Sequence, residues 1–258
     1  MTPFFQLDPR IESASAAALQ QVAPRFTEID EITEYNQLKV LRAFMDNGIS
    51  ERHFVSSTGY GYGDEGRETL DKVWAQVFGA EDALVRHNFT CGTHTLAVAL
   101  FGVLRPGNKM LCVSGMPYDT LHSVIGLTGE NMGSLKDYGI AFDCVPLKEE
   151  HLDYEAIAKA VDDTVTMVYI QRSRGYELRA SLSLEETQKV AEIAKEKNPN
   201  CIVMVDNCYC EFVNKQEPTQ VGADLIAGSL IKNAGGGMAR TGGYIAGRHD
   251  LVEKCAFR

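Results

Sequence analysis

Asp206 is the first residue whose position suggests chemistry, because it directly follows the apolar, strand-like run at residues 201–205. An isolated carboxylate at a buried strand end is costly unless it is paired, and the N–H of a protonated pyridine ring is one partner that would keep it ionised. A turn or helix cap is the ordinary alternative for an aspartate in this position. Asp206 alone leaves both interpretations open.

Lys232 lies in a glycine-rich segment at residues 222–237, which also carries Ser229. The apolar run before it indicates a strand that delivers both side chains to a sheet edge, and the glycines let the backbone pass close to a ligand. A lysine in an apolar pocket can lose its proton and attack a carbonyl carbon, as a Schiff-base lysine must. A surface lysine on a loop is the alternative. No Gly-Lys-Ser/Thr tripeptide ends the run, which excludes a P-loop.

Cys91, Gly92 and Thr93 stand between a strand-like run and a helical one. The N–H groups of a first helical turn, aided by the helix dipole and the Thr93 hydroxyl, can bind a phosphate. A plain N-cap is the alternative. His87 and His94 flank this segment, either as catalytic groups or as structural histidines whose hydrogen bonds are satisfied.

Two further segments follow apolar runs. Tyr118 comes after one of them, where its ring could lie flat on a bound heterocycle, although a core tyrosine is the alternative. Arg172, Ser173 and Arg174 follow another and are candidates for contact with a cofactor oxygen or a substrate carboxylate. Solvated loop arginines are the ordinary reading of that segment.

The elements that must position these residues alternate along the chain. The predicted strands occupy residues 83–85, 109–113, 164–170, 201–205 and 224–227, and the predicted helices residues 93–104, 154–161 and 183–197. Such alternation predicts an α/β fold with a mostly parallel sheet and helices on both faces, whose ligand site lies beyond the carboxyl ends of the strands. Two helices come earlier, one at residues 28–47 that ends at Gly48 and one through Leu70 that ends at Gly79.

Composition narrows the class of protein. The 258 residues carry a formal net charge of −10, which argues against nucleic acid as a partner. The longest apolar stretch, residues 96–104, is too short to span a membrane, and the first residues lack the basic segment of a signal peptide. We therefore expect a cytoplasmic protein. The seven cysteines suit reduced thiols, and no set of residues at ligand spacing indicates a metal site.

With these residues in place, the chain resembles the cystathionine/methionine γ-lyase group of pyridoxal-phosphate (PLP) enzymes, and most closely its aluminium-resistance branch. The strongest matches are residues 205–211 and the segment from Gly222 to Lys232. The resemblance implies a three-layer, aspartate-aminotransferase-like large domain that binds PLP. It also implies that Asp206 pairs with the pyridine nitrogen and that Lys232 forms the Schiff base.

The resemblance assigns further roles around the cofactor. It makes Cys91, Gly92 and Thr93 the phosphate-binding turn, and Ser229 a second phosphate ligand. Ile231 stands where the family usually has a threonine.

Tyr118 matches the tyrosine that stacks on the ring and that serves as the candidate acid in γ-elimination. Tyr60 and Tyr62 lie where the family supplies a Tyr-X-Arg pair to a neighbouring subunit, but no arginine accompanies them. The resemblance therefore implies a homodimer or homotetramer with shared active sites.

The expected domains are an N-terminal helical segment, residues 1–55, and a PLP-binding large domain, residues 56–258. Family members continue into a C-terminal small domain, which is expected to be missing here. The implied function is a PLP-dependent lyase that cleaves a C–S bond of cystathionine, cysteine or methionine by β- or γ-elimination. Two alternatives stay open: a non-catalytic PLP-binding fragment, and another PLP reaction such as aldol cleavage or transamination.

Overall fold

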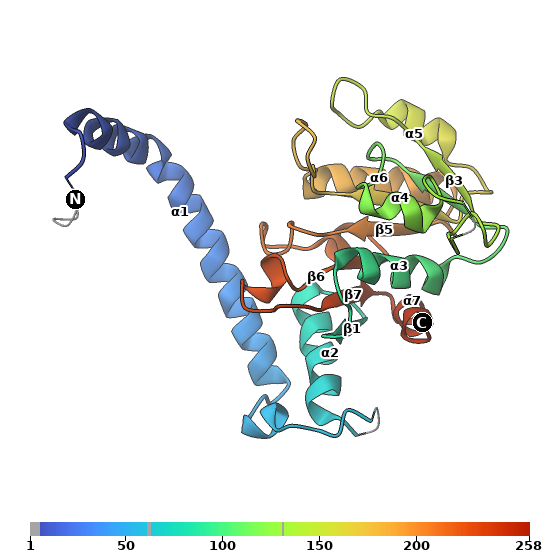
Figure 1. Cartoon of the computed structure of the whole chain (residues 1–258), viewed down its shortest axis with the longest axis horizontal. Helices are drawn as coiled ribbons and strands as arrows, with labels where there is room; N and C mark the ends of the chain where they lie inside the picture. The colour runs from blue at the N-terminus through green and yellow to red at the C-terminus, as the bar shows by residue number, and fades with distance from the viewer. Residues whose placement is uncertain (1–5, 61–62, 131) are drawn as a thin grey trace.

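The computed structural model describes residues 6–60, 63–130 and 132–258 and contains one seven-stranded sheet (Figure 1). The strand order is β1-β7-β6-β5-β4-β2-β3. The strands are β1 (Asp82–Arg86), β2 (Lys109–Cys112), β3 (Ala141–Cys144), β4 (Met167–Gln171), β5 (Ile202–Asp206), β6 (Leu225–Ser229) and β7 (Gly243–Gly247). Strands β3, β2, β4, β5 and β6 are parallel, whereas β7 runs antiparallel to both β6 and β1. The prediction of a mostly parallel sheet is confirmed.

Helices cover both faces of the sheet. They are α1 (Pro9–Asp46), α2 (Glu65–Phe78), α3 (Gly92–Val103), α4 (Thr120–Ile125), α5 (Tyr154–Ala160), α6 (Leu184–Lys197) and α7 (His249–Ala256), with short 3₁₀ turns η1 (Glu51–Phe54), η2 (Pro218–Val221) and η3 (Asn233–Gly235). Because side chains alternate across a strand, β4 sends Val168 and Ile170 into the core under α2, α5 and α6. It sends Met167 and Tyr169 into the core under α3, α4 and α7. The result is the three-layer arrangement that the sequence predicts.

Local signals fix several boundaries. Asp64 caps α2 by accepting the N–H of Arg67, and Gly79 ends that helix in the left-handed region at φ 61°. Gly48 follows α1 with φ 60°, as predicted from the sequence. A capping box between Ser183 and Glu186 begins α6.

Three element predictions need correction. The helix predicted at residues 28–47 begins at Pro9, because the alanine-rich stretch before residue 28 favours helix without showing an apolar period. The strand predicted at residues 164–170 begins at Met167, since Thr164 still belongs to a turn closed on Asp162. Strands β3 and β7 carry no clear signal: β3 is a partly exposed edge strand, and β7 is bounded by glycines. The domain division at residues 55 and 56 stays a prediction.

Candidate functional site

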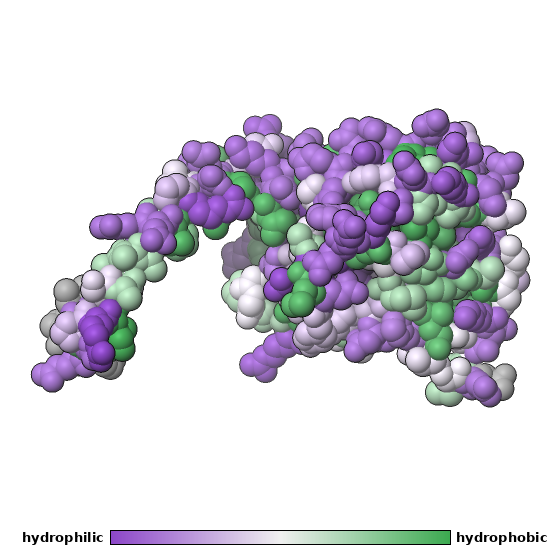
Figure 2. Space-filling model, turned by 90° about the horizontal axis from the view of Figure 1, so that it is seen from above, coloured by the Kyte–Doolittle hydropathy of each residue, from purple (hydrophilic) through white to green (hydrophobic). Residues whose placement is uncertain are grey.

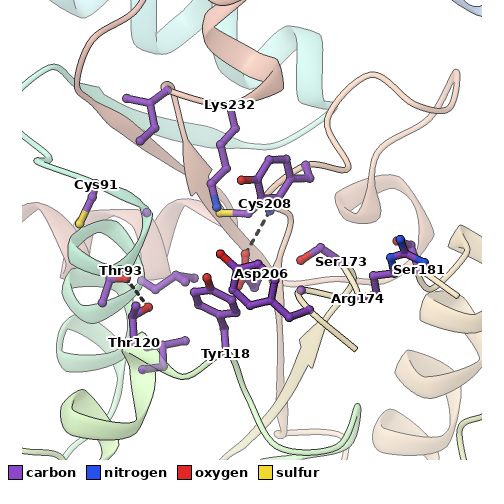
Figure 3. A pocket seen from close by; sticks show the side chains of 17 residues that line it. Cys91, Thr93, Tyr118, Thr120, Ser173, Arg174, Ser181, Asp206, Cys208 and Lys232 are labelled. Carbon is purple, nitrogen blue, oxygen red and sulfur yellow. Dashed lines mark hydrogen bonds between the residues drawn. The ribbon is translucent and has the colours of Figure 1, made fainter. Parts of the chain in front are cut away.

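A cavity of about 420 Å³ opens at the carboxyl edge of the parallel strands (Figure 3). Its wall comes from the start of α3, the loop after β2 with the start of α4, the loop after β4, and the segments that follow β5 and β6. Elements far apart in the sequence therefore meet here because parallel strands end at one edge of the sheet. Most of the residues singled out in the sequence lie on this wall.

Asp206 ends β5 on the floor of the cavity and is buried. Its Oδ1 accepts the backbone N–H of Cys208 at 3.0 Å, and its Oδ2 accepts the hydroxyl of Tyr169 at 3.4 Å. Burial raises the pKa of this carboxyl, while the two hydrogen bonds and the charge of Lys232 oppose that rise. A cationic N–H donor placed in the cavity would further favour the ionised form.

Lys232 follows β6 and extends its side chain into the same cavity, toward Asp206 and Cys208 (Figure 3). Its Nζ lies 4.1 Å from the centroid of the Tyr209 ring, on the face of which an ammonium group is attracted. Lys232 takes part in none of the ion pairs formed among residues 6–60, 63–130 and 132–258. The amine is therefore exposed to whatever occupies the cavity.

The first turn of α3 forms the opposite wall. Cys91 is the N-cap residue, and no side chain among the described residues caps this helix end, so its first N–H groups remain available. A Cβ on Gly92 would lie 3.2 Å from the sulfur of Cys208 and 3.3 Å from Cβ of Ser229. Thr93 shares a 2.6 Å hydrogen bond with the Thr120 hydroxyl. Because residue 92 is a glycine, the N-terminus of α3 can approach the sheet closely. The free N–H groups of a helix N-terminus form a favourable binding site for an anion.

Ser229 lies behind this turn, not on the cavity wall. Its side chain is fully buried beneath Gly92, and its Oγ accepts the N–H of Ile231 at 3.3 Å. Ile231 itself lines the cavity. The structure therefore places Ser229 against the backbone of the predicted phosphate turn.

Tyr118 lines the cavity beside the loop after β4. Its ring centroid is 5.8 Å from that of Tyr176, and a hydrogen bond with Tyr176 raises the pKa of the Tyr118 phenol to about 12. Gln171, at the end of β4, holds both segments: its Oε1 accepts the N–H of Tyr118 at 2.6 Å, and its Nε2 donates to the carbonyl of Ser173 at 3.0 Å. Gln171 was not among the candidate site residues identified from the sequence, although it is a polar residue at the end of a strand.

Arg172 does not meet the cavity, whereas its neighbours Ser173 and Arg174 line it. The Arg172 guanidinium is buried and donates to the carbonyl of Leu182 and to side-chain oxygens of Asn207 and Asn214. These three acceptors hold it on the other side of the sheet edge. A role for Arg172 in contacting a ligand in this cavity is therefore not supported by its placement.

Tyr60 is largely exposed and is not part of this cavity wall, and Tyr62 lies outside the described residues. His94 accepts the N–H of Thr90 through Nδ1 at 3.2 Å, and His87 faces a different cavity beside α2.

The cavity wall also contains residues that were not singled out from the sequence as site residues, among them Thr120, Tyr176, Cys208 and Tyr209. Of these, Cys208 and Tyr209 could have been found, because they directly follow Asp206.

No group of three or more His, Cys, Asp or Glu residues within the described residues could hold a metal ion. None of the helices in the described ranges is long and apolar enough to cross a membrane.

The mostly parallel sheet, its layers and a cavity that contains a lysine and a buried carboxylate define the chain as a fold type I PLP-enzyme large domain. The methionine gamma-lyase family model matches residues 11–258. The chain belongs to this family.

Individual relatives agree with this assignment. A crystal structure of a carbon-sulfur lyase involved in aluminum resistance from Clostridium novyi NT has a TM-score of 0.93 and 51% identity. The match covers 97% of this chain and 60% of that one. The uncharacterized protein YnbB of Bacillus subtilis is 49% identical over 233 residues, which are 90% of this chain and 55% of that protein.

The L-methionine gamma-lyase of Pseudomonas deceptionensis is 23% identical over 203 residues, which are 76% of this chain and 45% of that protein. This chain thus spans only about half to three fifths of the length of these relatives.

Proposed function

We propose that this chain is the cofactor-holding part of a PLP-dependent carbon–sulfur lyase that acts on a sulfur amino acid such as cystathionine, cysteine or methionine. The observation that carries the proposal is that Lys232 and Asp206 face one cavity whose other wall is the uncapped N-terminus of α3. The names of the related carbon-sulfur lyase and methionine gamma-lyase support the reaction class.

The residues present fit PLP in three respects. A buried carboxylate, Asp206, suits the protonated ring nitrogen, and the helix N-terminus at Gly92 and Thr93 suits the phosphate. Lys232 brings a primary amine for the aldehyde. When bound, PLP supplies an electron sink for the pair of electrons left when a bond at the amino-acid Cα breaks.

The chain's own residues then supply binding and proton transfer. Lys232 Nζ is the base that takes the proton from the substrate Cα, because it is the amine that extends into the cavity. Tyr118 keeps its phenolic proton at neutral pH, since its pKa is about 12, and it is the donor for a second proton transfer. Arg174 and Ser173, on the neighbouring loop, are the groups for the substrate carboxylate.

The substitution Lys232→Ala tests the proposal. It should abolish the absorbance change that PLP shows on covalent attachment, and it should lower keto-acid and thiol release from cysteine, cystathionine or methionine by at least about 100-fold. Lys197→Ala removes an exposed lysine at the end of α6 and is the matched control, which should behave like the unmodified chain. Turnover retained by Lys232→Ala would refute the assignment.

A further inference from the structure

Two cysteines face each other near one edge of the sheet. Cys112 and Cys144 are directly paired positions of the parallel strands β2 and β3, and neighbouring strands lie about 4.8 Å apart. Cys112 lies in the apolar cluster under α3, α4 and α7, and Cys144 packs against that cluster, so both side chains point to the same face of the sheet. Disulfides join residues whose Cα atoms are roughly 4.4–6.8 Å apart. The strand pairing therefore places these two sulfurs within reach of one another.

The surroundings make one thiol more accessible than the other. Cys112 is 0% exposed, and its S–H donates to the carbonyl of Gly115 at 3.0 Å. Cys144 is half-buried on β3, the outer strand at this end of the sheet, where Ala141 and Asp143 are exposed. Figure 1 shows β3 at this end of the sheet, and Figure 2 looks onto the same end of the body, where hydrophilic and hydrophobic residues both reach the surface. A small oxidant can therefore reach Cys144 first.

Electrostatics distinguish the two thiols in the same sense. When Cys144 loses its proton, the Cys112 thiol donates a hydrogen bond to its sulfur, and this lowers the pKa of Cys144. The same contact, together with burial, raises the pKa of Cys112 well above its usual value. The thiolate is the form of cysteine that reacts with oxidants. Cys144 is therefore suited to react first, and Cys112 to react with the product.

We propose that Cys112 and Cys144 form a reversible disulfide when the protein meets hydrogen peroxide. The Cys144 thiolate attacks one peroxide oxygen, the O–O bond breaks, and Cys144 becomes a sulfenic acid while the other oxygen leaves as hydroxide and takes up a proton to form water. The Cys112 sulfur then attacks the sulfur of Cys144, the S–O bond breaks, and the hydroxyl leaves with the Cys112 proton as a second water. Two thiols are oxidised and one peroxide is reduced. A dithiol reductant reverses the reaction by thiol–disulfide exchange.

The disulfide also acts on the loop that carries Tyr118. This loop, residues 113–118, directly follows Cys112 and turns at Gly115, whose φ is 80°. In the disulfide, Cys112 has no S–H left to donate to the Gly115 carbonyl. The loop then loses a contact that holds it against the sheet, and Tyr118 lies at its far end on the cavity wall. Oxidation of the pair therefore loosens one wall of the Lys232 cavity.

Peroxide treatment of the full 258-residue chain tests the disulfide. The reduced chain is treated with hydrogen peroxide, its remaining free thiols are blocked with iodoacetamide under denaturing conditions, and the digest is mapped by mass spectrometry. We expect a peptide pair that is linked through Cys112 and Cys144 and that dithiothreitol separates. The matched control Cys255→Ser removes a buried cysteine outside both strands and should keep the link. A chain in which both thiols stay free, or in which they link indiscriminately to other cysteines, would overturn the proposal.

Single variants test the order in which the two cysteines react. Cys112→Ser should leave Cys144 as a sulfenic acid, which dimedone labels, because the thiol that resolves it is gone. Cys144→Ser should show at least about tenfold less label at Cys112, because that thiol is buried and keeps its proton. Equal labelling of Cys144 and Cys112 in the two variants would contradict this order.

Amide hydrogen exchange tests the effect on the loop. Peptides that cover residues 113–118 should exchange at least about threefold faster in the oxidised chain than in the reduced chain, the effect of losing one weak hydrogen bond. Peptides from β6 are separated from β2 by two strands and should not change. Unchanged exchange at residues 113–118 would contradict the coupling. Since no experiment on this pair involves PLP or a substrate, the outcome is independent of the proposed lyase chemistry.

Discussion

Lys232 and Asp206 line the same cavity but differ in how firmly the surrounding residues hold their side chains. Asp206 is held in place by a backbone N–H and a tyrosine hydroxyl and lies buried on the floor of the cavity. Lys232 has a longer, flexible side chain, and its Nζ rests over the Tyr209 ring. The proposed function needs both: a carboxylate held in place and an amine that can reach a ligand.

A second buried carboxyl, Glu211, gives a prediction of pH dependence. Its Oε1 accepts the Tyr244 hydroxyl at 3.0 Å, and its Oε2 has no hydrogen-bond partner among the described residues. Burial raises the pKa of Glu211 to about 7. An unfolded chain would release that proton near pH 4.3. Between these values the folded chain holds a proton that the unfolded chain has lost.

The contribution of Glu211 to the free energy of unfolding is therefore fully present at low pH and is lost as pH rises toward 7. Glu211→Gln should remove it, so that the unmodified chain loses on the order of 2–3 kcal/mol more stability than the variant between pH 5 and pH 8. Urea unfolding followed by Trp74 fluorescence measures this difference. The control Glu196→Gln, on an exposed face of α6, should keep the unmodified profile. Parallel pH profiles for the unmodified chain and Glu211→Gln would show that Glu211 is not the cause.

At the scale of elements, the approach of α3 to the sheet depends on Gly92. Gly92→Ala should favour the helix itself, because alanine is the better helix former, yet its Cβ must push against Cys208 and Ser229. We expect the first turn of α3 to shift away and PLP affinity to fall by about tenfold, the effect of losing well-placed hydrogen bonds to a phosphate.

Titration of the cofactor-free chain with PLP, followed by absorbance, measures this loss. Thr93→Ser keeps the hydroxyl in the same turn and adds no bulk, so it should bind PLP like the unmodified chain. Unchanged affinity in Gly92→Ala would mean that this turn does not hold the phosphate.

The elements also explain what the sequence could and could not predict. Asp206 and Lys232 were identifiable because each directly follows an apolar run, and parallel strands must end at one edge. Gly92 was identifiable because it precedes a helical run. Arg172 was assigned to the same edge, but side chains alternate across a strand, and it continues the face of Val168 and Ile170, away from α3. Which face of a strand meets the cavity depends on distant helices. Tyr176 could not be predicted either, because its position depends on the conformation of the loop after β4.

At the scale of the whole molecule, the described chain is a three-layer body with a long helix that extends past it (Figure 1). The chain spans 60% of the related Clostridium novyi protein.

The most direct test of the central claim is to identify the residue to which PLP attaches. The chain is incubated with PLP, reduced with borohydride, digested and mapped by mass spectrometry. We predict a single modified residue, Lys232, and no modification at that position in a sample pretreated to remove PLP. Modification of a different lysine, or scattered modification of surface lysines without preference for Lys232, would contradict the account.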